Sequence, residues 1–184
     1  MSRTRHGVFT VFELLLRLCI VPRLRARLLG LLGASVGRNV RVGECRFINL
    51  ADGFSNLTLH DDVHVGADCI LDLAGPLTIG RGSVLSPRVT VMTHNDPGAS
   101  HGSPLVERFP PDARGAGVGA DCWVGTNATL LAGTDVGDGC VVGAMSLVRG
   151  RLLPGGTYVG IPARCMADHR AATSLSVPSD STDG

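Results

Sequence analysis

One histidine stands where a regular sequence pattern breaks off. His94 follows Thr93 and opens a stretch of roughly twenty residues without the six-residue rhythm found on both sides of it. Four prolines stiffen this stretch, which indicates an ordered loop inserted into a rigid framework. Imidazole changes its charge near neutral pH and is therefore an efficient general base. His94 is our candidate catalytic residue, and the alternative is an ordinary surface histidine.

The other histidines and the six cysteines form no comparable arrangement. His60 and His64 lie in a region of poor repeat, and His101 is a loop residue with an alternative role in touching substrate. No two cysteines form a CxxC or CxxxC pair, which argues against a disulfide framework. We expect no bound metal, with metal ligation by cysteine as the alternative.

The rhythm is clearest between residues 118 and 147. Five blocks follow one another there, VGADCW, VGTNAT, LLAGTD, VGDGCV and VGAMSL. The first position is aliphatic in all five, the second is glycine in four, and the fifth is always small. Less regular copies occur at 36–41, 65–70 and 79–90. Between Leu71 and Leu77 the phase slips by two residues, which predicts irregular coils there.

This pattern predicts a parallel β-solenoid. An even period preserves the alternation of side chains along a strand, and the recurring glycine indicates a sharp turn or a close approach of two backbones. Such units share one core only when they stack. The aliphatic residue then points inward beside a small fifth residue, which assigns Cys69, Cys122 and Cys140 to the core.

Three short motifs on this repeat resemble those of the hexapeptide-repeat acyltransferases, and in particular the sugar O-acetyltransferases of the maltose, galactoside and capsule-polysaccharide type. They are Thr-His at 93–94, CWVG at 122–125 and GIPAR at 160–164, and the resemblance covers roughly residues 36–165. It implies an all-β fold, a left-handed parallel β-helix with three six-residue faces per coil, although crossovers are usually right-handed. It also implies homotrimers with active sites between neighbouring subunits.

The resemblance further implies transfer of an acetyl group from acetyl-CoA to a hydroxyl of a sugar or glycan. His94 would be the general base in a ternary complex, with no acyl-enzyme. An orienting carboxylate is expected, and Asp72 matches best, with Asp96 and Glu107 as competitors. The alternative role of Asp72 is to bind acceptor hydroxyls. A backbone N–H at a nearby turn would stabilise the oxyanion.

The coenzyme positions implied by the resemblance lie further along the chain. Trp123 would line the site near the thioester, or else pack between subunits. A lysine that approaches the nucleotide phosphates in the family is replaced by Gly150, so the flanking Arg149 and Arg151 are candidates to supply the charge. The candidate coenzyme-binding residues are Trp123, Thr126, Ala144, Arg149 and Arg164.

The predicted organisation has three parts. They are a helical extension at 1–33, a β-helix domain at 34–168 with a loop inserted at 95–117, and a disordered tail at 169–184. We expect one helix up to Val21 and a short basic one over 23–29. Residues 1–46 hold nine arginines against two glutamates. The favoured role of the extension is a cap over the open end of the solenoid, and the alternative is a peripheral membrane contact through residues 8–32.

Composition and charge bear on partners and location. A formal net charge of +1 gives no reason to expect a nucleic-acid partner. The apolar stretch 8–21 carries Glu13 and Arg17 and is too short to span a bilayer, so we expect a cytoplasmic protein.

Other functions on the same fold stay open. They are N-acetylation of an amino sugar, acetylation of an antibiotic, transfer of a longer acyl chain, and a non-enzymatic scaffold. A γ-type carbonic anhydrase is a further alternative, but it needs three histidines at zinc, and His64 and His94 do not occupy matching repeat positions.

Overall fold

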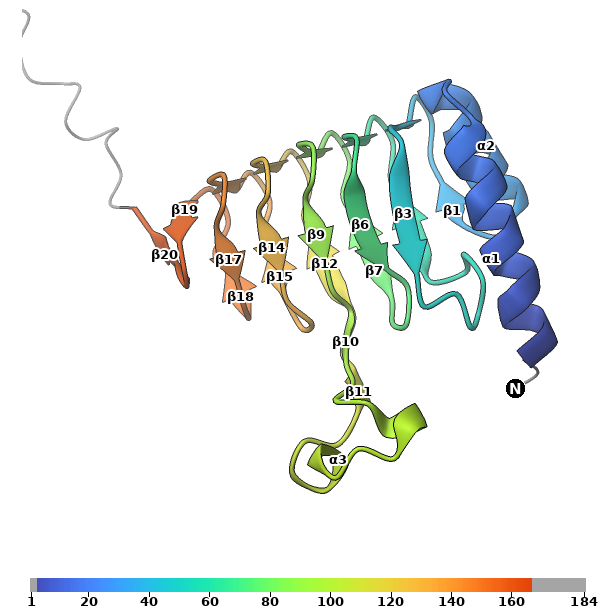
Figure 1. Ribbon diagram of the computed structural model, residues 1–184. Coiled ribbons are helices and arrows are strands. Elements are labelled where there is room, and N and C mark those ends of the chain that lie inside the picture. The colour runs from blue at the N-terminus through green and yellow to red at the C-terminus, as the bar shows by residue number, and fades with distance from the viewer. Residues whose placement is uncertain (1–2, 167–184) are drawn as a thin grey trace, which may run out of the picture.

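A computed structural model describes residues 3–166, which form a parallel β-solenoid with two helices at its N-terminal end (Figure 1). The tail predicted at 169–184 lies outside the described residues. Figure 1 also shows one long loop that leaves the regular wall of the solenoid.

Three sheets run along the solenoid, and each coil gives one strand to each sheet in turn. Sheet 1 contains β1 (Ser35–Val36), β4 (Leu57–Leu59), β7 (Leu77–Ile79), β12 (Ala116–Val118), β15 (Asp135–Val136) and β18 (Arg151–Leu152). Sheet 2 contains β2 (Arg41–Val42), β5 (His64–Val65), β8 (Val84–Leu85), β13 (Trp123–Val124), β16 (Val141–Val142), β19 (Thr157–Gly160) and β20 (Ala163–Cys165), of which β20 is antiparallel to β19. Sheet 3 contains β3 (Cys45–Ile48), β6 (Cys69–Asp72), β9 (Thr90–Val91), β14 (Thr129–Leu130) and β17 (Leu147–Val148).

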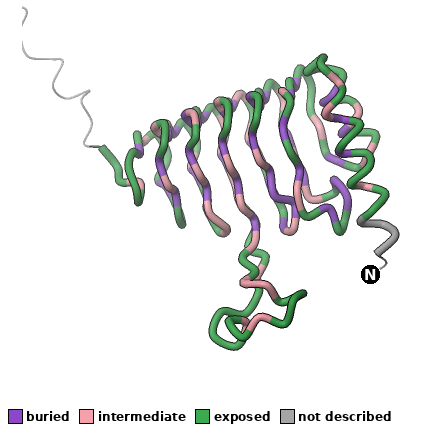
Figure 2. Tube along the Cα trace, viewed as in Figure 1, coloured by how far each residue is buried: buried purple, intermediate pink, exposed green. Residues whose placement is uncertain are grey.

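Aliphatic side chains at the first repeat position form ladders inside the solenoid. Ile79, Val118 and Val136 lie in register on neighbouring strands of sheet 1, and each is at most 2% exposed. Figure 2 shows the same recurrence of buried positions along the coils. Fully burying a side chain of this kind contributes about 1.5–3 kcal/mol. The predicted solenoid core is confirmed, and so is the placement of Cys69, Cys122 and Cys140, which are buried free thiols.

Glycine at the second repeat position is needed for close approach, not for an unusual backbone conformation. A Cβ on Gly125 would lie 2.6 Å from the backbone nitrogen of Ala144 in the next coil. The positive φ values fall two residues later, at the fourth position of the block, as at Asn127 with φ of 59°. Asn and Asp tolerate this left-handed conformation better than most residues. Of the two roles predicted for the second-position glycine, the structure therefore assigns only the close approach.

One edge of the solenoid departs from the regular period. It joins sheet 3 to sheet 1 and is called here the loop edge; its first three corners are residues 49–56, 73–76 and 92–115. The two-residue slip predicted after Leu71 falls in the second of these corners, between β6 and β7. The corner before it is longer, and the third carries the inserted loop. The irregular coils therefore follow one another along a single edge.

The inserted loop is ordered and leaves through a narrow neck. Strand β10 (His94–Asn95) pairs antiparallel with β11 (Asp112–Ala113), and the 3₁₀ helix η1 (Ala99–His101) and helix α3 (Leu105–Arg108) lie between them. The regular wall resumes at Ala116, where β12 begins.

Two helices pack on the first coil. Helix α1 (Arg3–Leu18) ends at Leu18 rather than at the predicted Val21, and α2 (Pro22–Leu31) is longer than the predicted segment 23–29. Pro22 begins α2 because proline lacks an N–H, which the first turn does not need. Helix α1 contacts β3, and α2 contacts β1 and β2. Within the described residues, neither helix is both long and apolar enough to cross a bilayer.

A buried arginine joins these helices to the solenoid. The guanidinium of Arg25, which is 2% exposed, donates hydrogen bonds to the backbone oxygens of Leu16 at 3.0 Å and Val42 at 3.1 Å, and to that of Cys19. Leu16 belongs to α1, Cys19 to the connection between the helices, and Val42 to β2. Arg25 therefore fixes both helices on the first coil.

Because the coils stack closely, we expect an added methyl group to destabilise the protein at a repeat glycine but not at a glycine in a helix. Gly125→Ala should lower the free energy of unfolding by about 1–3 kcal/mol, because the new Cβ meets backbone that has no room to move. The matched control is Gly30→Ala in α2, where the nearest atom to a new Cβ lies 3.9 Å away and alanine favours the helix. Denaturant unfolding measures both, and equal effects would contradict this account of the repeat.

Candidate active site

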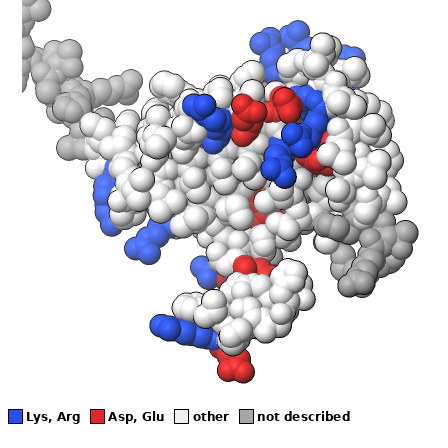
Figure 3. Space-filling view, viewed as in Figure 1, with Lys and Arg blue, Asp and Glu red and all other residues white. Residues whose placement is uncertain are grey.

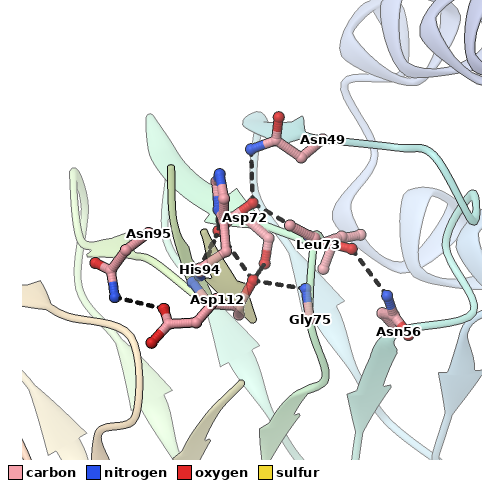
Figure 4. A network of polar contacts seen from close by, with 10 residues as sticks. Asn49, Asn56, Asp72, Leu73, Gly75, His94, Asn95 and Asp112 are labelled. Atoms are coloured by element: carbon pink, nitrogen blue, oxygen red, sulfur yellow. Dashed lines mark hydrogen bonds and ion pairs between the residues drawn. The ribbon is translucent and has the colours of Figure 1, made fainter. Parts of the chain in front are cut away.

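A histidine and an aspartate meet at the root of the inserted loop (Figure 4). The Nδ1 atom of His94 lies 2.5 Å from Oδ2 of Asp72. Asp72 is the last residue of β6 and is completely buried, whereas the side chain of His94, at the start of β10, is 22% exposed. The sequence-predicted pair is therefore brought into direct contact, with the imidazole on the accessible side.

The carboxylate of Asp72 is surrounded by hydrogen-bond donors. Its Oδ1 accepts from Nδ2 of Asn49 at 2.8 Å and from the backbone N–H of Ala74 at 3.1 Å. Its Oδ2 accepts from the backbone N–H groups of Thr93 at 2.8 Å and His94 at 3.2 Å, and it lies 2.9 Å from the Thr93 hydroxyl. An ionised carboxylate satisfies all of these donors because it only accepts.

The surroundings of Asp72 determine its charge. Burial raises the pKa of this carboxyl, but hydrogen bonds from Asn49, His94, Thr93 and Ala74 outweigh burial and hold the pKa below its ordinary value. Asp72 is therefore ionised at neutral pH.

The charge of Asp72 fixes the tautomer of the histidine. Because the carboxylate only accepts, Nδ1 of His94 must carry the shared proton. In the neutral ring this leaves the lone pair on Nε2. Nε2 is then the ring nitrogen that can accept a hydrogen bond or a proton.

A cavity of about 700 Å³ lies against His94. The loop supplies one wall through Arg108, Phe109 and Pro110, and Leu131 of the next coil supplies part of another. The charged side chains of the loop lie below the solenoid wall in Figure 3. The cavity is large enough for a small ligand beside the imidazole.

Polar contacts fix the neck of the loop beside this cavity. Asp112 accepts from Nδ2 of Asn95 at 2.8 Å and from Nε of Arg114 at 2.6 Å, and these two partners lower the pKa of its carboxyl. The hydroxyl of Thr93 accepts from the backbone N–H of Gly75 at 2.9 Å. The backbone around His94 is therefore held by the pairing of β10 with β11 and by the corner 73–76 of the preceding coil.

The competing carboxylates have other surroundings. Asp96 accepts from the backbone N–H groups of Gly98 at 2.8 Å and Ala99 at 2.7 Å, and these bonds lower the pKa of its carboxyl. Glu107 is exposed on α3. Asp72 is thus the carboxylate in contact with His94. Asn49, which the sequence reasoning missed, approaches from the preceding coil.

The candidate coenzyme residues lie elsewhere on the solenoid, with one exception. Trp123 is 55% exposed on sheet 2 and donates from Nε1 to the hydroxyl of Ser86 at 2.9 Å. Thr126 and Ala144 occupy the corners that follow β13 and β16, and Arg164 is exposed on β20. Arg149 alone follows a sheet 3 strand and therefore lies along the loop edge with His94.

Sheet 2 faces away from the loop edge, because that edge lies between sheets 3 and 1. One protomer therefore does not bring Trp123, Thr126, Ala144 or Arg164 to His94.

The histidines of the carbonic anhydrase alternative are also dispersed. His60 follows β4, His64 lies in β5 of sheet 2, and His94 lies on the loop edge. Over residues 3–166 there is no group of three His, Cys, Asp or Glu side chains placed to hold a metal ion.

The fold and the repeat define a hexapeptide-repeat β-solenoid. The family model described as "Bacterial transferase hexapeptide (six repeats)" matches residues 115–150. The *Escherichia coli* K12 protein WcaF, named as a colanic acid biosynthesis acetyltransferase, is 36% identical over 129 residues, or 70% of this chain and 66% of the relative. The *E. coli* K12 protein WbbJ, named as a lipopolysaccharide biosynthesis O-acetyl transferase, is 32% identical over 126 residues, or 65% of this chain and 61% of the relative. The chain belongs to the hexapeptide-repeat transferase family.

The matched region spans less than two thirds of either relative. Among solved structures, a hexapeptide-repeat-containing acetyltransferase from *Vibrio cholerae* superimposes with a TM-score of 0.73 at 18% identity, over 88% of each chain. Its complex with acetyl coenzyme A gives a TM-score of 0.63 at 20% identity, over 90% of this chain and 85% of the other. At these identities the likeness concerns the fold.

Because Asp72 is buried and ionised, we expect its replacement by a neutral residue to lower the free energy of unfolding by an amount that depends on pH. Asp72→Asn should lower the free energy of unfolding at pH 7 by about 1–3 kcal/mol, because the new amide turns a donor toward other donors. The folded pKa of Asp72 is depressed, so its stabilisation is complete above the ordinary carboxyl pKa of about 4 and is lost as the pH falls toward the lower folded pKa. The difference between the two proteins should therefore shrink in acid.

Denaturant unfolding at a series of pH values measures this difference. Asp121→Asn, at an exposed position, is the control and should show little loss at any pH. A gap between wild type and Asp72→Asn that stays constant into acid would show that the carboxylate is not ionised in the folded protein.

Proposed function

We propose that the protein transfers an acetyl group from acetyl-CoA to a hydroxyl of a sugar or glycan. The observation that carries the proposal is the contact between buried, ionised Asp72 and His94, whose ring borders a cavity of about 700 Å³. Membership of a transferase family and relatives named as acetyltransferases support the same reaction class.

The proposed reaction is a direct transfer in a ternary complex. Nε2 of His94 takes the proton of the acceptor hydroxyl as its oxygen attacks the thioester carbonyl carbon. The tetrahedral intermediate then expels the coenzyme thiolate, which receives the proton back from the imidazolium. Asp72 stabilises the imidazolium while it exists, because the two opposite charges share one hydrogen bond. The products are an acetyl ester and free coenzyme A.

The donor is assigned from the family and from chemistry. The *V. cholerae* protein of the same fold was solved with acetyl coenzyme A. Trp123, Thr126, Ala144, Arg149 and Arg164 are the residues we propose for coenzyme binding. The arginines would bind the phosphates of the coenzyme. The corners that contain Thr126 and Ala144 lie on successive coils, because the backbone N–H of Met145 donates a hydrogen bond to the backbone oxygen of Thr126 at 2.9 Å. Acetyl-CoA is a cytoplasmic metabolite, so we place the reaction in the cytoplasm.

The separation of these residues from His94 favours a shared site in a homotrimer. Each site would take His94 from the loop edge of one protomer and the sheet 2 residues from its neighbour. Exposed apolar residues accompany those sheet 2 positions, namely Trp123 at 55%, Met145 at 62% and Ile161 at 72% exposure. Apolar patches of this kind are typical of surfaces that associate. A cyclic, head-to-tail arrangement would repeat the contact at every interface.

We propose a sugar of a surface polysaccharide as the acceptor. This proposal is supported by two relatives, which are named for colanic acid biosynthesis and for lipopolysaccharide biosynthesis. The name of WbbJ as an O-acetyl transferase supports O-acetylation as the proposed reaction.

Removal of the base tests the mechanism. His94→Ala should lower turnover by roughly 10²–10⁴-fold, the usual contribution of a general base. Release of coenzyme A thiol, measured with a panel of sugars and polysaccharide repeat units, follows the reaction. His60→Ala, at an exposed position beyond β4, is the matched control. Thermal unfolding of each variant checks its fold, and wild-type turnover in a folded His94→Ala protein would remove the assignment.

Complementation tests the shared site. His94→Ala and Ala144→Trp, the latter intended to block the coenzyme groove, should each be inactive. Co-expressed in equal amounts, they should regain about a quarter of wild-type activity, because random assembly pairs an intact His94 with an intact neighbouring groove in that share of interfaces. Mixed oligomers are verified by differential tagging. A mixed oligomer without activity would show that each site lies within one protomer.

A further inference from the structure

The outer surface of the two N-terminal helices is apolar. One side of the helical pair packs inward through Leu16, Ala26 and Leu29, which are at most 4% exposed. The other side leaves Leu18 77% exposed and Leu31 83% exposed, and Ile20 between the helices 89% exposed. Further exposed apolar residues on the same helices are Val8, Val11, Phe12, Leu14, Leu15 and Leu24.

This surface has a hollow between the helices. A cavity of about 330 Å³ is lined by apolar side chains alone, from α1, α2 and Leu32 just after α2. Its lining residues are Phe12, Leu15, Leu16, Leu28, Leu31 and Leu32. An element that only capped the end of a solenoid would present a polar outer face to water. The exposed apolar face therefore requires a partner.

Basic side chains border this apolar surface. Arg23 and Arg27 lie one turn apart on α2 and are exposed, while Leu24, Leu28 and Leu31 form the adjacent stripe of the same helix. Arg23, Arg27 and Arg38 also line a second hollow beside α2. Figure 3 shows basic side chains at this end of the molecule, with acidic side chains beside some of them.

These arginines differ in their partners. Arg38 is paired with Asp61, at 2.8 Å between Nη2 and Oδ2, whereas within residues 3–166 neither Arg23 nor Arg27 forms an ion pair with a carboxylate. The two glutamates of residues 1–46 are both engaged: Glu13 is 6% exposed and accepts from Phe47 N–H, and Glu44 lies 3.7 Å from Arg17. An apolar stripe next to a row of arginines on a short helix is the pattern of an element that lies in a membrane interface.

We propose that the outer surface of α1 and α2 binds a bilayer that carries anionic lipid. The apolar side chains enter the boundary between headgroups and acyl chains, and Arg23 and Arg27 neutralise the headgroups. A second copy of the chain fits less well, because a two-fold contact through this surface would bring the same arginines of both copies together without counter-charges. This proposal does not depend on the acetyl-transfer reaction.

The test is sedimentation of the full chain with vesicles. Wild type should sediment with vesicles of equal parts phosphatidylcholine and phosphatidylglycerol and stay in solution with phosphatidylcholine alone, and added salt should weaken binding. Arg23→Gln combined with Arg27→Gln should weaken binding roughly thirty-fold. Leu18→Ser combined with Leu31→Ser should weaken it by about tenfold or more, because two leucines no longer enter the interface.

Matched variants at the other parts of the solenoid serve as controls. Arg81→Gln with Arg88→Gln removes two exposed charges, and Leu105→Ser with Leu153→Ser removes two exposed apolar side chains, of 52% and 67% exposure. Both controls should bind vesicles like wild type. Circular dichroism melts confirm that each protein is folded, and light scattering gives its oligomeric state.

Three outcomes would overturn the proposal. They are wild-type protein that stays in solution with the anionic vesicles, helix variants that bind as well as their controls, and helix variants that lose an oligomer rather than vesicle binding. The last result would assign the surface to a second copy. Since no acetyl transfer is measured, failure here leaves the proposed enzyme activity standing.

Discussion

The stacking of coil on coil constrains what each position of the repeat can hold. Parallel strands lie about 4.8 Å apart, so the backbone of one coil closely approaches that of the next at the glycine corners. At Gly125 this leaves no room for a methyl group, while the ladder of Ile79, Val118 and Val136 requires aliphatic side chains inside. In the regular coils, most positions are therefore constrained by stacking, and few are available for catalytic side chains.

The candidate site occurs where this constraint is relaxed. Asn49, Asp72 and His94 come from the three successive irregular corners of the loop edge or from the strand ends beside them. Stacking still holds those coils in register, so donors from three coils converge on one carboxylate. The result is an ion that is buried yet fully hydrogen bonded, which is the condition for keeping a charge in a protein interior. The solenoid wall and the neck of the loop thus position the histidine together, and the distal part of the loop is not needed for its support.

Much of the fold was readable from the sequence because the repeat encodes it locally. The aliphatic first position predicted the core, and the loss of rhythm after His94 marked the loop. Asp72 was recognisable only through resemblance to a family, and its contact with Asn49 was not, because the two are 23 residues apart across corners of unequal length. The end of α1 was misplaced at Val21 because the apolar pattern continues past Leu18, where the helix stops. The separation of Trp123 from His94 is a property of three-dimensional topology, and it appears in no local pattern.

The neck of the inserted loop separates the positioning of the imidazole from the shaping of the cavity beside it. Asn95, Asp112 and Arg114 close the base of the loop with their own contacts, so the segment beyond them can change in length or sequence while the wall keeps its register. Substitutions in that distal segment would alter the shape of the chamber beside the imidazole without disturbing the imidazole itself. The architecture is in this sense modular, and new acceptor preferences could evolve by exchange of the tip alone.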